Sequence, residues 1–343
     1  MLMLSLVTAA VTGILSFVVA RWLSRHGDRV GLVDRPNDRS LHVSVTQRAG
    51  GAGFALLVPC AAAAALWLTI GIDARQLTIM LSALGVAIVG FADDRWGLPA
   101  LLRFLLQIAA AAAVVTSGVV LSTISLPGAT LTLGPLAVPL TIAWIVGLTN
   151  VYNFMDGIDG IAATQALVTT AALGGVCVIL GRYDLGLTML IEGAGVLGFL
   201  GLNWPPARVF MGDVGSTFLG FTFAACSIFG TIGQPRVPFL AWIVVLSPFL
   251  ADALITIARR IMRGEALWKA HRTHFYQRLV QSGWTHKRTT LLYGACAMWA
   301  GRLTVLHYGF LMPSEAVYVS AALMPVLLPP LLLSRQPLPG AVH

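Results

Sequence analysis

Long apolar runs alternate with short polar segments along the chain, and this pattern predicts a bundle of membrane-spanning helices. A helix needs about 20 predominantly apolar residues to cross a bilayer, and eleven stretches approach that length. The predicted spans are residues 3–20, 50–71, 77–92, 100–119, 136–151, 161–181, 186–202, 215–231, 237–258, 289–310 and 315–333. Between spans four and five, residues 121–135 alternate polar and apolar positions around Pro127-Gly128, which predicts a small β-hairpin.

Composition supports an all-α polytopic membrane protein, with residues 1–343 as one membrane-embedded domain. The chain is 57% hydrophobic and 10% charged, with a mean hydropathy of +0.83, whereas soluble domains carry about 25% charged residues. Its four cysteines all lie within apolar runs, which is typical of buried thiols. The first run leads directly into Arg21 and Arg25, which predicts an uncleaved first span.

The basic residues predict how the bundle is oriented. Because eleven spans place the termini on opposite sides, alternate connecting segments face the same side. Eighteen of the 22 Lys and Arg fall in segments 21–49, 93–99 with the adjoining Arg103, 203–214, 259–288 and the C-terminal tail. Basic loops stay in the cytoplasm, so the N-terminus is predicted to be periplasmic and the C-terminus cytoplasmic. The net charge of +8 then reflects orientation and contact with anionic lipid or phosphate, and nucleic acid is not expected.

The most informative polar stretch is N-V-Y-N-F-M-D-G-I-D-G, at residues 150–160, which is predicted to be a cytoplasmic loop of the active site together with segments 21–49, 93–99, 203–214 and 259–288. A carboxylate in the bilayer centre costs at least about 2.5–3.5 kcal/mol, so Asp156 and Asp159 are functional candidates. The alternative is a polar turn between two spans. A turn favours Asn, Asp and Gly, but it does not require two Asp residues framed by Asn150 and Asn153.

Further acidic residues fall at predicted helix ends on the same side. Asp93 and Asp94 are adjacent, and neighbouring carboxylates need a cation or a shared proton. The alternative is a polar helix end with Arg95 as counter-ion. Asp213 follows Gly212 at a predicted helix start, where free N–H groups suit a phosphate and where the glycine lets the backbone approach a ligand. Its alternative role is a helix N-cap.

Two polar loops and one acid within a span complete this side. The first loop reads D-R-P-N-D-R-S-L-H from residue 34, and the last reads H-R-T-H-F-Y-Q-R from residue 271. His271 and His274 would share a helix face, yet zinc needs more ligands than these. A basic aromatic loop suits a nucleotide sugar or a lipid phosphate better. Asp252, within the ninth predicted span, is a further functional candidate. Its alternative role is an ion pair within the bundle.

Carboxylates and basic loops on one face predict phosphoryl transfer to a lipid. Mg²⁺ prefers oxygen ligands and takes few of them from protein, and phosphoryl transfer needs a metal and a cationic clamp around the phosphates. A site at the membrane implies that one substrate is a lipid. The residues alone therefore predict a phosphotransferase that depends on Mg²⁺, with Mn²⁺ as a second option, at the cytoplasmic interface.

From about Asp34 to Thr285 these motifs resemble the polyprenyl-phosphate N-acetylhexosamine-1-phosphate transferase family. They are D-R-P-N-D-R-S-L-H then R-A-G-G, D-D-R at 93–95, N-V-Y-N-F-M-D-G-I-D-G, N-W-P-P-A-R-V-F-M-G-D-V-G-S at 203–216 and P-F-L-A-D at 248–252. The resemblance implies ten or eleven helices in a bacterial inner membrane, where a homodimer is one option. It also implies Mg²⁺ and transfer of a sugar-1-phosphate from a UDP-N-acetylhexosamine to undecaprenyl phosphate, with release of UMP.

The resemblance also implies roles for residues by matching position. Asp93 and Asp94 match an aspartate pair near the lipid phosphate and the metal, and Asp213 matches the direct Mg²⁺ ligand, with Asp94 beside it. Asp156 and Asp159 match catalytic residues of the nucleotide and metal site. The implied substrate-binding residues are Asp34, Asn150, Asn153, Asn203, Phe210 (packing on the uracil), His271, Arg272, His274 and Arg278.

One departure from the family concerns the last cytoplasmic loop. Many relatives carry a run of His residues there, but His274 is followed by Tyr276 and Gln277 at the corresponding positions. Because that loop contacts the sugar in the family, the identity of the sugar stays open. The departure favours the branch that starts O-antigen or similar surface polysaccharides over the murein enzyme.

Two mechanisms and two rival functions stay open from the sequence. The lipid phosphate attacks the donor directly, with Asp93 or Asp94 keeping it deprotonated, or the reaction passes through an aspartyl intermediate. A secondary transporter would place its polar residues near the bilayer midplane, whereas here most lie at helix ends. A CDP-alcohol phosphotransferase would need further Arg and Asp after Asp156-Gly157, and this chain lacks them.

Overall fold

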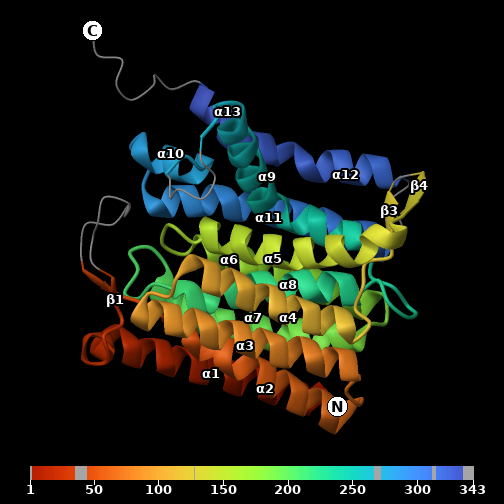
Figure 1. The fold of residues 1–343 in the computed structure, drawn as a ribbon, viewed down its shortest axis with the longest axis horizontal. Helices are drawn as coiled ribbons and strands as arrows, with labels where there is room; N and C mark the ends of the chain where they lie inside the picture. Colours follow the sequence, from red (N-terminus) through yellow and green to blue (C-terminus); the bar gives the residue numbers. More distant parts are fainter. Residues whose placement is uncertain (1, 35–44, 127, 266–271, 311–313, 335–343) are drawn as a thin grey trace.

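The structure, a computed structural model, describes residues 2–34, 45–126, 128–265, 272–310 and 314–334. Most of these residues form a bundle of long helices that run side by side (Figure 1). The helices are α1 (Leu2–His26), α2 (Ala52–Thr69), α3 (Ala74–Trp96), α4 (Ala100–Thr116), α5 (Ala137–Met155), α6 (Ile161–Ile179), α7 (Tyr183–Asn203), α8 (Gly212–Phe229), α9 (Phe239–Met262), α10 (Phe275–Gln281), α11 (His286–Phe310), α12 (Glu315–Leu323) and α13 (Leu328–Ser334), with short 3-10 turns η1 (Gly27–Val30), η2 (Gly134–Leu136) and η3 (Met324–Leu327).

Each predicted span coincides with helical structure, and the all-α fold class is confirmed. Nine stretches of the described chain are long and apolar enough to cross a membrane. Two predicted spans lie outside that set, since α4 is shorter, at 17 residues, and α11 is not among the nine. The last span is divided into α12, η3 and α13 around Pro325, Pro329 and Pro330, because proline lacks the N–H that continues a helix.

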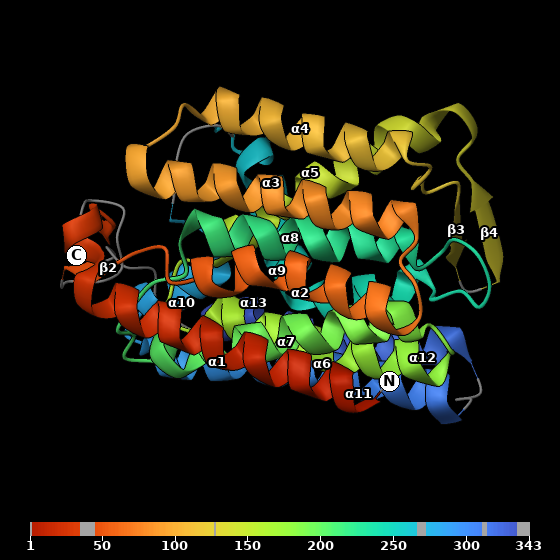
Figure 2. The ribbon, with the colours of Figure 1, turned by 90° about the horizontal axis from the view of Figure 1, so that it is seen from below.

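Two small antiparallel hairpins lie at opposite ends of the bundle (Figures 1 and 2). Strands β3 (Thr123–Leu126) and β4 (Ala129–Thr132) pair as predicted. Strands β1 (Val33–Asp34) and β2 (Thr46–Gln47) pair at the other end, beside the C-terminus of α1. We call this second end, which carries β1 and α10, the polar end.

Helix α8 is the centre of the bundle, and all of its residues are buried. Glycines let its neighbours approach closely. A Cβ on Gly90 of α3 would lie 2.6 Å from the Asp213 carbonyl oxygen, and one on Gly220 of α8 would lie 2.7 Å from the Leu148 carbonyl oxygen of α5. Such small residues are what bring helix backbones together where no hydrophobic effect drives helices together. The start of α8 is thereby held directly against the end of α3.

Helix α9 turns away from the bundle along its length, as Figure 1 shows. Pro248 lies inside it, and a proline within a helix removes one hydrogen bond and causes a kink. The half of α9 beyond this proline carries Leu254, Ile257 and Arg260, which line a groove shared with α3, α4 and α5. The bend therefore forms one wall of that groove.

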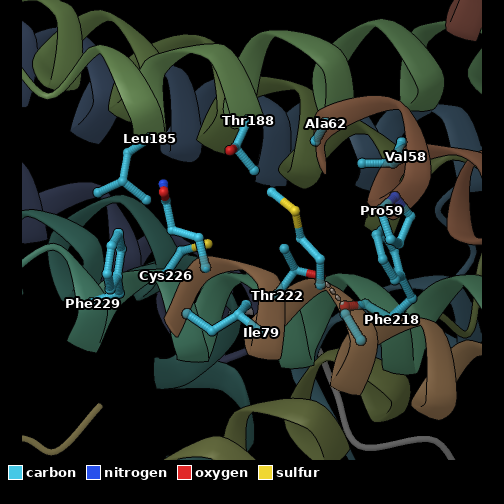
Figure 3. A pocket seen from close by; sticks show the side chains of 13 residues that line it. Val58, Pro59, Ala62, Ile79, Leu185, Thr188, Phe218, Thr222, Cys226 and Phe229 are labelled. Atoms are coloured by element: carbon cyan, nitrogen blue, oxygen red, sulfur yellow. Dashed lines mark hydrogen bonds between the residues drawn. The ribbon is translucent and has the colours of Figure 1, made fainter. Parts of the chain in front are cut away.

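A second, much smaller cavity lies between α2, α3, α7 and α8 (Figure 3). It has a volume of about 20 Å³, room for roughly a single water molecule. Its lining is mainly apolar, from Val58 and Ile79 to Leu185, Phe218 and Phe229. Nothing in this lining suggests a reactive site.

One buried acid lies far from the polar end. Glu192 in the middle of α7 is fully buried, and neither of its side-chain oxygens has a hydrogen-bond partner in the described part of the chain. A buried polar group without partners costs about 1–3 kcal/mol. We expect Glu192→Leu, a change of similar volume, to raise the melting temperature in detergent. Glu192→Ala should melt below the Leu variant, because it leaves a cavity. A Leu variant less stable than the wild type would show that the carboxyl has a partner.

Candidate active site

Asp94 organises the carboxylates at the polar end. It lies in the last turn of α3, and its two side-chain oxygens accept the N–H groups of Asp213 at 2.9 Å and Val214 at 3.0 Å. Asp94 thus satisfies the free N–H groups at the start of α8, where a negative charge is favourable. The N-cap role considered for Asp213 falls instead to Asp94, and the Asp213 carboxylate is available for other contacts.

Two arginines bind these carboxylates together. Arg48 donates to Asp94 at 2.7 Å and to Asp213 at 2.9 Å. Arg103 of α4 donates to Asp213 at 2.7 Å and also to Asp93. Arg95, the counter-ion considered from the sequence, makes no ion pair with them in the described residues. Three carboxylates face two guanidinium groups, so with every group ionised the cluster carries one net negative charge.

In the structure, Gly212 allows the close approach of other parts of the protein. A Cβ at this position would lie 2.9 Å from the backbone of Ala49 and would also collide with the Asp94 side chain. Gly212 has a positive φ of +76°, which side chains other than glycine rarely adopt. The glycine therefore serves the packing of α3, α8 and the Arg48 segment against one another.

The asparagines of the 150–160 stretch belong to a helix. Helix α5 continues to Met155, so only residues 156–160 form the connection that was predicted to begin at residue 150. Asn153 donates to Ser216 on α8 at 2.9 Å, and Asn150 donates to Gln107 on α4 at 2.7 Å. Both asparagines line the same groove as Arg103 and Asp213.

This groove joins an apolar lane to the charged cluster. It has a volume of about 1340 Å³. Its apolar lane is lined by residues of α3, α4, α5 and α9, among them Val86, Phe104, Ile142, Val146 and Leu254. Its polar end is lined by Arg103, Asn150, Asn153, Asp213, Arg260, His274 and Gln277. A ligand with a long apolar tail and an anionic head matches this distribution.

A second group of predicted residues gathers at the start of α6. The carboxylate of Asp159 accepts the Ala207 N–H at 3.0 Å and lies 3.2 Å from the His286 ring. The amide of Asn203 accepts the Gly160 N–H and donates to the Val209 carbonyl, both at 3.0 Å. Asn203 is buried, so its visible role is to hold the two loops that carry Asp159 and Phe210. Phe210 itself donates its N–H to the Gln47 carbonyl at 2.8 Å.

The remaining predicted residues lie on β1 and around α10, at the polar end. Asp34 stands on β1, paired with Thr46 of the strand that leads to Arg48. Arg272 and Arg278 flank the start of α10, and burial together with Arg259 and Arg263 lowers the pKa of Arg278. Helix α10 begins at Phe275, so the helical pairing expected for His274 is wrong, since His274 precedes the helix. His271 lies outside the described residues.

Several contact residues do not stand out in the sequence. Arg103 is an ordinary basic residue until the fold brings it to the carboxylates, and Arg48, although it begins the R-A-G-G motif, was not predicted to contact them. His286 and Gln107 belong to no polar motif. A charge count could have found the two arginines, because an acidic cluster at membrane depth needs compensating cations.

Asp156 gives the folded protein a pH dependence of stability. Burial, together with the neighbouring Asp213 and Asp94 carboxylates, raises the pKa of Asp156 well above its usual range. An unfolded Asp titrates near about 3.9. Above that value the folded state binds more protons than the unfolded state, so stability falls as pH rises toward the folded pKa.

We expect Asp156→Asn to melt at a higher temperature than the wild type, with a difference that grows from acidic to mildly basic pH. Thermal melts of both proteins in detergent, without divalent cations, measure this difference. A difference that stays constant with pH would contradict the expectation.

Comparisons with known proteins agree with this arrangement. Residues 76–231 match the family described as glycosyl transferase family 4. A probable undecaprenyl-phosphate N-acetylglucosaminyl 1-phosphate transferase of Bacillus subtilis is 30% identical over 84% of this chain and 81% of its own. A decaprenyl-phosphate N-acetylglucosaminephosphotransferase of Mycobacterium leprae is 33% identical over 80% of this chain and 75% of its own. An undecaprenyl-phosphate alpha-N-acetylglucosaminyl 1-phosphate transferase of Escherichia coli is 28% identical over 85% and 81%. The family match runs from α3 to the end of α8 and includes Asp93, Asp94 and Asp213, and this chain belongs to the polyprenyl-phosphate N-acetylhexosamine-1-phosphate transferase family.

Proposed function

We propose that this protein transfers an N-acetylhexosamine-1-phosphate from a UDP-sugar to undecaprenyl phosphate and releases UMP. The observation that carries the proposal is the groove, whose apolar lane ends at Asp213, Arg103 and Asn153. A polyprenyl chain would lie in the lane and bring its phosphate to the charged end. The names of the relatives, which are polyprenyl-phosphate N-acetylglucosamine-1-phosphate transferases, support the same reaction class.

The donor would bind beside this groove, at the Asp159 group. Phe210 lies three residues before Asp213, and Asn203 joins the loop that carries Phe210 to the segment that carries Asp159. In the reaction an oxygen of the lipid phosphate forms a bond to the β-phosphorus, which carries the sugar. The bond from that phosphorus to the bridging oxygen breaks, and the oxygen leaves with UMP. Arg48 and Arg103 would bind the phosphates, and Asp93 would keep the attacking phosphate deprotonated.

The donor atoms at the cluster fit Mg²⁺. Within the described residues no three His, Cys, Asp or Glu side chains are grouped to hold a metal by themselves, but Mg²⁺ commonly uses one or two carboxylates with waters and substrate phosphates. Asp213 faces the groove, and the cluster keeps one negative charge. Asp213 lines the groove, whereas Asp94 does not and uses both oxygens to accept the N–H groups that start α8, so we assign Asp213 as the ligand and Asp94 as its support. When bound, Mg²⁺ would neutralise diphosphate charge.

We further propose that the reaction is the first membrane step in the synthesis of an O-antigen or a similar surface polysaccharide, in the bacterial inner membrane. The support is the loop after His274, where Tyr276 and Gln277 replace the longer His run of the murein enzyme. Gln277 lines the groove, so this difference changes the wall of the site.

The test uses the purified full chain in detergent with Mg²⁺, undecaprenyl phosphate and a panel of UDP-N-acetylhexosamines. We expect UMP and a lipid-linked sugar diphosphate in equal amounts, loss of both products with EDTA, and recovery with added Mg²⁺. Release of UDP would overturn the proposal in favour of plain glycosyl transfer. Absence of turnover over the whole panel would overturn it in favour of a transporter.

A further inference from the structure

Asp252 of α9 is a buried carboxylate to which the proposed reaction assigns no role. Its Oδ1 accepts from Nδ1 of the His274 ring at 3.1 Å and from the Phe275 N–H at 2.9 Å. Its Oδ2 accepts from the Tyr276 N–H at 3.1 Å and from the Tyr293 hydroxyl. Both Asp252 and His274 are 3% exposed. The partner within the bundle that the sequence suggested for Asp252 is thus the α10 segment, with His274 at its start.

The His274 ring forms part of the groove wall. It lines the groove together with Gln277 and Arg260, the latter paired with Glu265 at 3.0 Å. Asp213 and Arg103 line the same groove. Because Nδ1 bonds to Asp252, any contact of the ring with a ligand in the groove goes through Nε2.

A second anchor fixes the same segment. The Tyr276 hydroxyl donates to the Phe154 carbonyl at 2.9 Å, and its ring stacks on the His274 ring at 5.8 Å between centroids. Gly157 leaves the space for this hydroxyl, since a Cβ there would collide with it. His274 is thus held between α9 and the connection that carries Asp156, and its ring has little freedom to turn.

We propose that Asp252 is a positioning residue, which holds the His274 ring so that its Nε2 donates a hydrogen bond to the phosphate of the lipid acceptor. With both ring nitrogens donating, the ring is an imidazolium, and the buried carboxylate balances its charge. The phosphate is the acceptor's and not the nucleotide's, because His274 lines the groove with the apolar lane, whereas Asp159 and Phe210 do not. The inference rests on the proposed function for the identity of this acceptor.

Binding of a fluorescent polyprenyl phosphate and of the matching polyprenyl alcohol tests the contact without turnover. For the full chain in detergent, we expect His274→Gln and Asp252→Asn each to weaken binding of the phosphate about tenfold and to leave the alcohol unchanged. The double variant should bind no more weakly than His274→Gln, because Asp252 acts through His274. Equal losses for phosphate and alcohol would overturn the inference.

Tyr293→Phe is the matched control, since it removes another hydrogen bond to Asp252 without touching His274. If Asp252 only joined α9 to its neighbours, Tyr293→Phe would weaken phosphate binding as much as Asp252→Asn. We expect at most about a twofold effect from it.

Kinetics separate this inference from the proposed function. We expect the acceptor KM of Asp252→Asn to rise about tenfold, with the KM for the UDP-sugar unchanged, and imidazole to restore turnover to His274→Gly only while Asp252 is present. Rescue without Asp252, or a change in the donor KM alone, would overturn the inference. A wild-type protein that prefers the phosphate in binding but transfers no sugar would instead overturn the proposed function.

Discussion

Replacing Asp213 by Asn is expected to reduce transfer by a factor on the order of 10³, about 4 kcal/mol in transition-state stabilisation. Asp213 is the carboxylate that both Arg48 and Arg103 contact and that faces the groove. The amide keeps the shape of the side chain but removes the charge, so the cluster becomes neutral and loses its attraction for Mg²⁺. Initial rates of UMP release at saturating substrates measure the effect.

Asp73→Asn is the matched control for this substitution. Asp73 caps the start of α3 at the opposite end of the bundle and accepts the Arg75 N–H at 2.7 Å. Asn is an equally good N-cap, so we expect activity and melting temperature close to those of the wild type. Activity of Asp213→Asn within tenfold of the wild type would remove Asp213 as the metal ligand.

Gly90→Ala is expected to lower activity at least tenfold, although it replaces no side chain of the catalytic cluster. A Cβ on Gly90 would lie 2.6 Å from the Asp213 carbonyl oxygen and 2.7 Å from the Val214 Cα. Because backbone atoms cannot give way as a side chain does, the start of α8 must move away from α3. The hydrogen bonds from α8 to Asp94, and with them the position of Asp213, would then change. Overpacking of this kind also costs about 1–3 kcal/mol of stability.

Gly85→Ala separates this effect from a general effect of alanine in α3. A Cβ on Gly85 has no other atom within 4 Å, and alanine is the better helix former. Activity should be measured at a temperature where both variants remain folded by thermal melts. Equal activities of the two variants would show that the α3–α8 contact does not control the site.

The fold class follows from the sequence because apolar runs of sufficient length have few stable alternatives in a membrane. The runs therefore locate the long helices, though not α10, and alternation around Pro127-Gly128 locates the β3–β4 hairpin. The acidic motifs are also visible, since carboxylates at membrane depth are costly and rarely incidental. Helix ends are harder to predict from the sequence. Helix α5 continues to Met155, so Asn150 and Asn153 lie in the helix and not in the predicted loop.

Only the tertiary structure decided which groups face each other. Arg48 and Asp213 are 165 residues apart, and Arg103 and Asp213 are 110 apart. Local sequence patterns cannot predict contacts between residues so far apart in the chain. The cap of α8 comes from Asp94 on another helix, because the close approach at Gly90 brings an α3 carboxylate to its N–H groups. Sequence alone thus determined the helices and the kind of chemistry. The packing of the helix backbones decided that Asp94 caps α8, that Asp213 faces the groove and that Asp252 contacts His274.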